Sequence, residues 1–347
     1  KNNNEKNSNL KQRSIFLVNA GNANAFTGEE GSLACEEKAD ALSALFNCEK
    51  KNIFFASTGV IGEQLPYKKI IEKFGLLKEN LSCRNFSEAS EAILTTDLKP
   101  KTYKSEFKIY NKSFTISGFA KGSGMIFPNM ATMLAFIFTD FQIDKNTLSL
   151  YTQKAVDESF NRITVDGDTS TSDTVFVSTT NKETLEISIE KRPKALRDFY
   201  KELKNAMVNL AKKIVMDGEG AKKFIEITVK NAKNVFRAKK ICFSIANSLL
   251  VKTAIAGEDA NWGRLVMAIG KSKINLDIKK LKIFMQGFLL CENGKGIETT
   301  DEDKLSKALK KNKVAIVIDL AEGNKKFTAW TSDLTEEYIR INADYRS

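Results

Sequence analysis

The chain has 347 residues, enough for about two domain-sized units, and its 42% hydrophobic and 28% charged content is ordinary for a soluble globular protein. The formal net charge is +11, but the lysines are scattered and not interleaved with aromatic residues, which favours a solvated surface over nucleic-acid binding. No apolar run approaches the ~20 residues that span a membrane, and the N-terminal residues lack the apolar core of a signal peptide.

Histidine is absent from the chain, so acyl-transfer chemistry would need a different base. The cysteines are widely spaced and odd in number, and they form no C-x-x-C pair: Cys35, Cys48, Cys83, Cys242 and Cys291. This pattern predicts reduced, mostly buried thiols in the cytoplasm and no metal site.

The hydrophobic pattern predicts strands and helices in an irregular order. The N-terminal third is expected to contain short buried strands at 15–18 and 53–55, helices at 32–48 and 66–74, and a hairpin at 107–110 and 114–117. Beyond it we expect helices at 148–160 and 193–216 and strands at 224–229 and 314–320. Because no regular βαβ rhythm is visible, the sequence predicts an α+β fold with layered sheets and helices in two subdomains.

A turn at Thr58 and Gly59 directly follows the second predicted strand. A backbone N–H beside a hydroxyl can bind a developing oxyanion, so these two residues are candidate oxyanion donors. The alternative is an ordinary strand-to-helix turn.

The most informative segment is residues 118–140. A glycine-rich turn carries Lys121, Pro128 interrupts the backbone, and Ala131 and Thr132 precede an apolar run. A threonine freed at a new N-terminus can act as a nucleophile with its own amine as base. The alternative is that Thr132 caps a helix through 133–138. Lys121 lies outside any G-x-x-x-x-G-K-[ST] spacing, so a substrate carboxylate competes with phosphate as its ligand.

Glu219 lies between two glycines just after the longest predicted helix, and it is a candidate for facing a cationic substrate. The alternative is a solvated carboxylate in a turn. The polar loop at 161–174 lacks the glutamate that a calcium loop would need, which favours a loop that supports an active site.

Together these segments resemble the ornithine acetyltransferase (glutamate N-acetyltransferase) family of arginine biosynthesis, from about residue 15 to residue 347. The most specific match is Lys-Gly-Ser-Gly-Met-Ile at 121–126 followed by Asn-Met-Ala-Thr-Met-Leu at 129–134. Further matching stretches follow in order: 19–28, 57–62, 93–97, 165–170, 217–221, 247–252, 257–264 and 341–347.

The resemblance implies self-cleavage between Ala131 and Thr132, which would divide the chain into an α chain, 1–131, and a β chain, 132–347. It implies that Thr132 takes acetyl from N-acetylornithine, releases ornithine and passes the acetyl group to glutamate, with no metal or organic cofactor. The roles carried over by motif are an oxyanion hole at Thr58 and Gly59 and substrate binding by Thr95, Lys121, Thr132, Glu219, Asn342 and Ser347. From chemistry alone, Glu219 would pair with the ornithine ammonium and Lys121 with a carboxylate.

The resemblance also implies an assembly of two α and two β chains in the cytoplasm, bound to neither nucleic acid nor membrane. It leaves open whether acetyl-CoA is a second donor. Three departures stand out: family members carry tens of residues ahead of the first strand, and Ser347 and Ser172 replace the usual threonine and asparagine. The rival interpretations are an N-terminal-nucleophile amidase or aminopeptidase, a non-enzymatic phosphate or nucleotide binder, and an inactive homologue.

Overall fold

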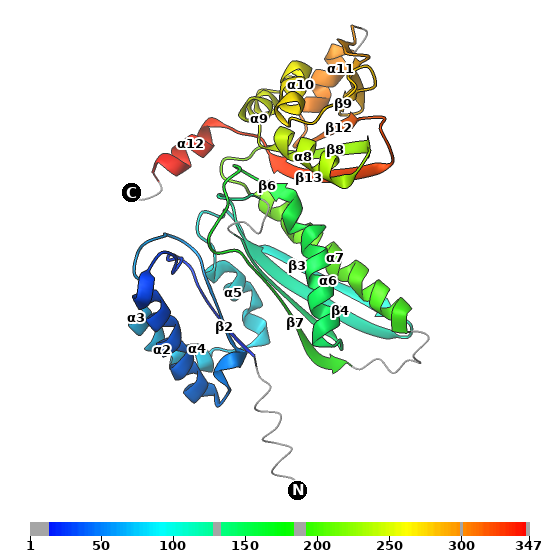
Figure 1. The fold of residues 1–347 in the computed structure, drawn as a ribbon. Coiled ribbons are helices and arrows are strands. Elements are labelled where there is room, and N and C mark those ends of the chain that lie inside the picture. The colour runs from blue at the N-terminus through cyan, green and yellow to red at the C-terminus, as the bar shows by residue number, and fades with distance from the viewer. Residues whose placement is uncertain (1–13, 128–132, 184–191, 299–300, 345–347) are drawn as a thin grey trace.

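The computed structural model describes residues 14–127, 133–183, 192–298 and 301–344. These residues form three sheets with helices packed on their faces, which confirms the predicted α+β class (Figure 1). No helix within the described ranges is both long and apolar enough to cross a membrane.

The N-terminal unit is built on two parallel strands, β1 (Ile15–Asn19) and β2 (Ile53–Ser57), which confirms both strand predictions. One face of this pair packs against helices through Leu42, Ile53 and Phe74. The helices on the N-terminal side of the molecule are α2 (Gly28–Phe46), α3 (Tyr67–Ile71), α4 (Phe74–Glu79) and α5 (Phe86–Ala92).

The central sheet has the order β3-β4-β5-β7, with the first three strands antiparallel and β5 parallel to β7. One of its faces is covered by the helices α6 and α7, and the other packs on the N-terminal unit. Phenylalanines fill that second interface, where the ring centroids of Phe16 and Phe176 lie 4.8 Å apart. The elements are β3 (Lys101–Ile109), β4 (Lys112–Lys121), β5 (Leu134–Phe141), β7 (Thr174–Glu183), α6 (Lys145–Asp157) and α7 (Arg192–Met216).

Residues 134–138 belong to strand β5, so the alternative of a helix through 133–138 is wrong. Successive side chains of β5 point to opposite faces of the sheet, and both faces are covered. Ala135 and Ile137 lie in the core beneath α7, whereas Leu134 and Phe136 lie in the core against the N-terminal unit. A strand buried on both faces shows no alternation of polar and apolar residues, which is why the run resembled a buried helix.

The third sheet has seven strands in the order β11-β10-β9-β12-β8-β13-β6. Helices packed beside it complete its core, with Ile241 from α8 and Leu265 from α10 fully buried. The strands are β6 (Ile163–Thr164), β8 (Phe224–Ala232), β9 (Lys282–Met285), β10 (Phe288–Glu292), β11 (Lys295–Gly296), β12 (Lys313–Asp319) and β13 (Lys325–Ser332). The helices are α8 (Val235–Ala246), α9 (Leu249–Ala256), α10 (Trp262–Lys271) and α11 (Glu302–Leu309).

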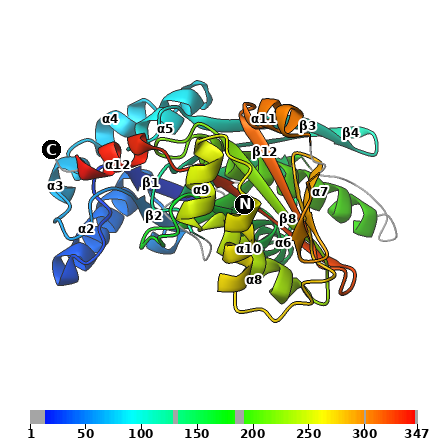
Figure 2. The ribbon, with the colours of Figure 1, turned by 90° about the horizontal axis from the view of Figure 1, so that it is seen from above.

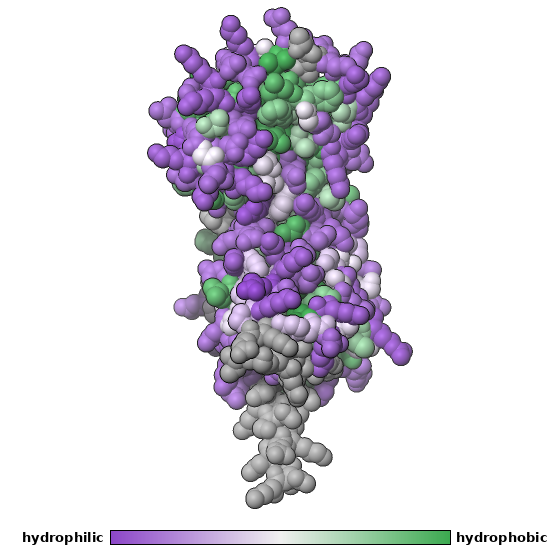
Figure 3. Space-filling view, turned by 90° about the vertical axis from the view of Figure 1, so that its right-hand side faces the viewer, coloured by the Kyte–Doolittle hydropathy of each residue, from purple (hydrophilic) through white to green (hydrophobic). Residues whose placement is uncertain are grey.

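The last helix, α12 (Glu336–Ala343), leaves the seven-stranded sheet after β13. Figures 1 and 2 both place it on the side of the N-terminal unit. The face shown in Figure 3 is mainly polar, and its apolar residues gather at the height of the seven-stranded sheet. The chain thus brings the ends of β2, β4, α7 and α12 into one region, where the candidate site lies.

Candidate active site

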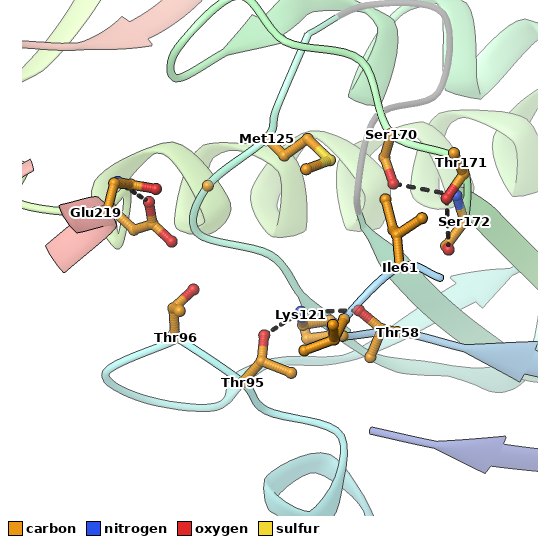
Figure 4. A pocket seen from close by; sticks show the side chains of 14 residues that line it. Thr58, Ile61, Thr95, Thr96, Lys121, Met125, Ser170, Thr171, Ser172 and Glu219 are labelled. Atoms are coloured by element: carbon orange, nitrogen blue, oxygen red, sulfur yellow. Dashed lines mark hydrogen bonds between the residues drawn. The ribbon is translucent and has the colours of Figure 1, made fainter. Parts of the chain in front are cut away.

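A cavity of about 310 Å³ lies where these chain segments meet (Figure 4). Each wall comes from a different part of the sequence, because the turn after β2, the end of β4, the turn after α7 and the helix α12 all contribute. The lining residues are Thr58, Gly59, Val60, Ile61, Thr95, Thr96, Lys121, Gly124, Met125, Ser170, Thr171, Ser172, Glu219 and Asn342.

The turn after β2 is hydrogen-bonded to the loop that follows β1. The Thr58 N–H donates to the Asn19 carbonyl at 3.1 Å, and the Val60 N–H donates to the Gly21 carbonyl at 3.2 Å. Gly59 has φ +128, and a Cβ there would lie 2.3 Å from the carbonyl carbon of Gly21. Only glycine permits this close approach. Among the described residues the Gly59 N–H has no hydrogen-bond partner, so it can donate to a ligand.

Lys121, the last residue of β4, is buried and directs its ammonium group at three acceptors. Its Nζ lies 2.7 Å from Thr95 Oγ1, 3.2 Å from Thr58 Oγ1 and 3.6 Å from Asp97 Oδ2. Figure 4 shows the lysine between the two threonines. Burial lowers the pKa of Lys121 below its usual value, and the Asp97 carboxylate opposes that shift. Because Lys121 donates to Thr58 Oγ1, the Thr58 hydroxyl keeps its own proton for another acceptor.

Glu219 forms another wall, across the cavity from Thr58 in Figure 4. Its backbone N–H donates to the Ser123 carbonyl at 3.1 Å, and its Oε2 accepts from Asn342 Nδ2 at 2.8 Å. The residue is 7% exposed, and no lysine or arginine of the described ranges forms a salt bridge with it. A buried carboxylate without a counter-ion is costly, so this position favours a cationic ligand.

Two aspartates anchor the chain on either side of residues 128–132. Asp166 accepts the N–H groups of Met125 and Ile126 at 2.6 and 3.0 Å. Asp173 accepts the N–H of Met133 at 3.1 Å, and its second oxygen is buried with no partner among the described residues. Burial raises the pKa of Asp173 to about 7.

The structure brings together six of the residues that the sequence singled out: Thr58, Gly59, Thr95, Lys121, Glu219 and Asn342. The predicted nucleophile Thr132, its neighbour Ala131 and the terminal Ser347 lie outside the described residues, so these assignments stay predictions. The same holds for the proposed division into 1–131 and 132–347.

Two residues at or next to the cavity carried no individual prediction. Thr96 lines the cavity and Asp97 holds Lys121, yet the sequence showed them only as part of the matching stretch 93–97. Ser172 also lines the cavity, so the departure from the usual asparagine falls on the pocket wall.

Hydrogen-bond donors at one end of the cavity and, at the other, a buried carboxylate with no salt bridge among the described residues suit acyl transfer to and from an amine. The chain belongs to the ArgJ family, whose model matches residues 2–347. This confirms the family resemblance inferred from the sequence and the prediction of an enzyme.

Curated relatives agree closely with this assignment. The Arginine biosynthesis bifunctional protein ArgJ of Gluconobacter oxydans is 44% identical over 333 residues, covering 96% of this chain and 78% of the relative. The protein of that name from Bradyrhizobium diazoefficiens is 44% identical over 336 residues, covering 96% of this chain and 81% of the relative. A crystal structure of Arginine biosynthesis bifunctional protein argJ from Bacillus halodurans is 40% identical with a TM-score of 0.58, covering 62% of this chain and 100% of that chain.

Proposed function

We propose that this protein transfers acetyl from N-acetylornithine to glutamate through an acetyl ester on Thr132. The observation that carries the proposal is the pairing of two features in one cavity. The first is the Gly59 N–H, which has no hydrogen-bond partner among the described residues, beside the Thr58 hydroxyl, and the second is the buried carboxylate of Glu219, which forms no salt bridge with any of those residues. The first suits a tetrahedral oxyanion and the second suits the side-chain ammonium of ornithine.

Self-cleavage between Ala131 and Thr132 would create the nucleophile. The Thr132 hydroxyl attacks the Ala131 carbonyl carbon, the peptide C–N bond breaks to give an ester, and water hydrolyses the ester to free the Thr132 amine. An α-amine has an unperturbed pKa of about 7.7–8.0, which suits a general base in a chain without histidine. The solved relative supports a cut at this position. Its whole chain matches 62% of the present chain, and residues 132–347 would make up the same share of it.

The transfer then follows a ping-pong cycle. The Thr132 amine takes the hydroxyl proton as the oxygen attacks the acetyl carbonyl, and the oxyanion accepts hydrogen bonds from Thr58 and Gly59. Collapse breaks the amide C–N bond, and the ornithine nitrogen leaves with the proton. The glutamate amine next attacks the ester, and the same steps run in reverse to give N-acetylglutamate and free Thr132.

Several finer points belong to the same proposal. The reaction needs no metal or organic cofactor, because the threonine and its amine supply nucleophile and base. The word bifunctional in the relatives' names motivates acetyl-CoA as a second donor. The family resemblance further suggests two α and two β chains per assembly, located in the cytoplasm.

Mass spectrometry of the denatured protein together with an acetyl-transfer assay tests the proposal. The wild type should give a fragment beginning at Thr132 and should release ornithine only once per site until glutamate is added. Thr132→Ala should remain one uncut chain without transfer, whereas Thr132→Ser, which keeps the hydroxyl, should still be cut. A cut and active Thr132→Ala protein would refute the nucleophile. Continuous release of acetate without glutamate would indicate an amidase instead.

A further inference from the structure

Beneath the cavity lies a row of four charged side chains, which we call the buried charge chain: Lys121, Asp97, Lys101 and Asp217 in that order. Their side chains are 3%, 0%, 1% and 2% exposed, so water screens them little. Two positive and two negative charges alternate, and the row is neutral overall. Of the four, only Lys121 lines the cavity.

Each carboxylate in the buried charge chain also fixes backbone. Asp97 accepts the Gly122 N–H at 2.6 Å and the Thr95 N–H at 3.3 Å, so it joins β4 to the loop after α5. Asp217 accepts the Leu98 N–H at 3.1 Å, which joins the same loop to the end of α7. Burial by itself would raise the pKa of Asp97, but Lys121, Lys101 and the Gly122 N–H outweigh it and hold that pKa below its usual value.

The position of Lys121 has a direct consequence for Thr58. The Lys121 ammonium donates hydrogen bonds to Thr95 Oγ1 and Thr58 Oγ1 and forms a salt bridge with Asp97 Oδ2 at 3.6 Å. Asp97 is the charged group among these three partners, so its attraction for the ammonium favours the position from which Lys121 reaches Thr58. A hydroxyl that accepts from an ammonium becomes a stronger donor itself, because hydrogen bonds in series polarise one another.

We propose that Asp97 is a positioning residue: it holds Lys121 against Thr58 Oγ1, so that the Thr58 hydroxyl donates to the oxyanion that forms in the transition state. This inference rests on the proposed acetyl transfer. It differs from a purely structural role, in which the buried charge chain would only stabilise the fold, and buried ion pairs are weak evidence for such stabilisation.

The first test is Asp97→Asn, which keeps the shape and an acceptor oxygen but removes the charge. Removing one oxyanion donor typically costs about 10²–10³ in kcat, and a weakened donor costs less, so we expect kcat to fall about 10- to 100-fold. The loss should fall on kcat more than on KM for N-acetylornithine, because the oxyanion that Thr58 stabilises forms only in the transition state. The matched control is Asp319→Asn, which breaks a partly buried pair with Lys230 at 3.3 Å in the seven-stranded sheet and should leave kcat unchanged.

The double variant D97N/K101M keeps the experiment decisive if Asp97→Asn folds poorly. It removes one charge of each sign and leaves the remaining pair neutral. If the buried charge chain is only structural, restoring its charge balance should restore both folding and kcat, and that result would overturn the proposal. If Asp97 acts through Lys121, folding recovers while kcat stays low.

A readout independent of the reaction is the titration of the Lys121 ammonium, followed by ¹⁵N NMR of lysine-labelled protein and assigned with Lys121→Met. Asp97→Asn should lower the pKa of Lys121, because the carboxylate that favours its charged form is gone. An unchanged Lys121 titration would overturn the proposal. A wild type that fails to transfer acetyl would refute the proposed function instead, while the titration would still decide whether Asp97 holds Lys121.

Discussion

Replacing Glu219 by glutamine should make the protein more stable and less active at once. Glutamine keeps the shape and the carbonyl that accepts from Asn342 at 2.8 Å. It removes a negative charge that is 7% exposed and has no salt bridge in the described part of the chain. In the free enzyme that charge is costly, whereas with ornithine bound it gains a counter-ion.

The magnitude follows from the kind of bond that is lost. A hydrogen bond to a charged group contributes about 1.5–3 kcal/mol, which corresponds to about a 10- to 150-fold loss in kcat/KM for N-acetylornithine. The unfolding free energy of Glu219→Gln should rise by about 1 kcal/mol, because a buried unpaired charge is replaced by a neutral amide.

The assay separates the two half-reactions. Ornithine release from N-acetylornithine should show the full loss, whereas exchange between N-acetylglutamate and labelled glutamate should change by less than about threefold, since neither carries a side-chain ammonium. Glu292→Gln is the control, because its partly exposed pair with Lys282 lies on a hairpin of the seven-stranded sheet and contributes at most about 1 kcal/mol. Equal losses for both substrates, or a destabilised Glu219→Gln, would refute the assignment of Glu219 to the ammonium.

Two further predictions concern the turn after β2 and the anchor of β5. Gly59→Ala should destabilise the folded protein by about 2–3 kcal/mol, because the new Cβ would lie 2.3 Å from the Gly21 backbone. It should also lower kcat at least ~100-fold, because the N–H of residue 59 would move away from the oxyanion. Asp173→Asn should become progressively more stable than wild type between about pH 4 and 7, by about 1–2 kcal/mol after discounting for solvent screening. The pKa of Asp173 is about 7 in the folded protein and 3.8 in the unfolded chain, so the folded protein binds the proton more tightly. The wild type therefore loses stability relative to the asparagine variant as the pH rises through this window.

Each of these has a simple check by thermal or urea unfolding. Gly62→Ala is the control for Gly59, since it also has a positive φ of +83 but meets nothing within 4 Å. Gly62→Ala should lower the free energy of unfolding by about 1 kcal/mol, the cost of the backbone strain alone, and it should leave kcat near the wild-type value. For Asp173, a stability difference that stays constant from pH 4 to 8 would show that the carboxyl does not titrate in that window.

Local pattern alone predicted the elements whose residues repeat regularly. The apolar stripe on helix α7 is an example: Leu203, Met207, Leu210 and Ile214 are all fully buried. The hairpin of β3 and β4 also followed from alternation, although both strands extend further than expected. Strand β5 did not follow, because burial on both faces removes the alternation that marks a strand.

The sequence identified only those site residues that belong to a recognisable local motif. Thr58, Gly59 and Glu219 stood out because glycine-flanked polar residues suggest sites, and the family resemblance added Thr95 and Asn342. The buried charge chain could not be foreseen, since Lys101 and Asp217 are 116 positions apart and ordinary in composition. Pairing across such a distance depends on how the sheet brings β3 and α7 together.

The central sheet has a consequence for how such a protein must be assembled. A cut between residues 131 and 132 falls between β4 and β5, which pair from Ile116 with Thr139 to Lys121 with Leu134. Each fragment alone would expose an unpaired strand edge, a template for aggregation. If the chain is cut there as proposed, folding would have to come first, and the cut protein would be a complementing pair of fragments. Co-expression of the two fragments from separate genes should then recover far less soluble protein than expression of the intact chain.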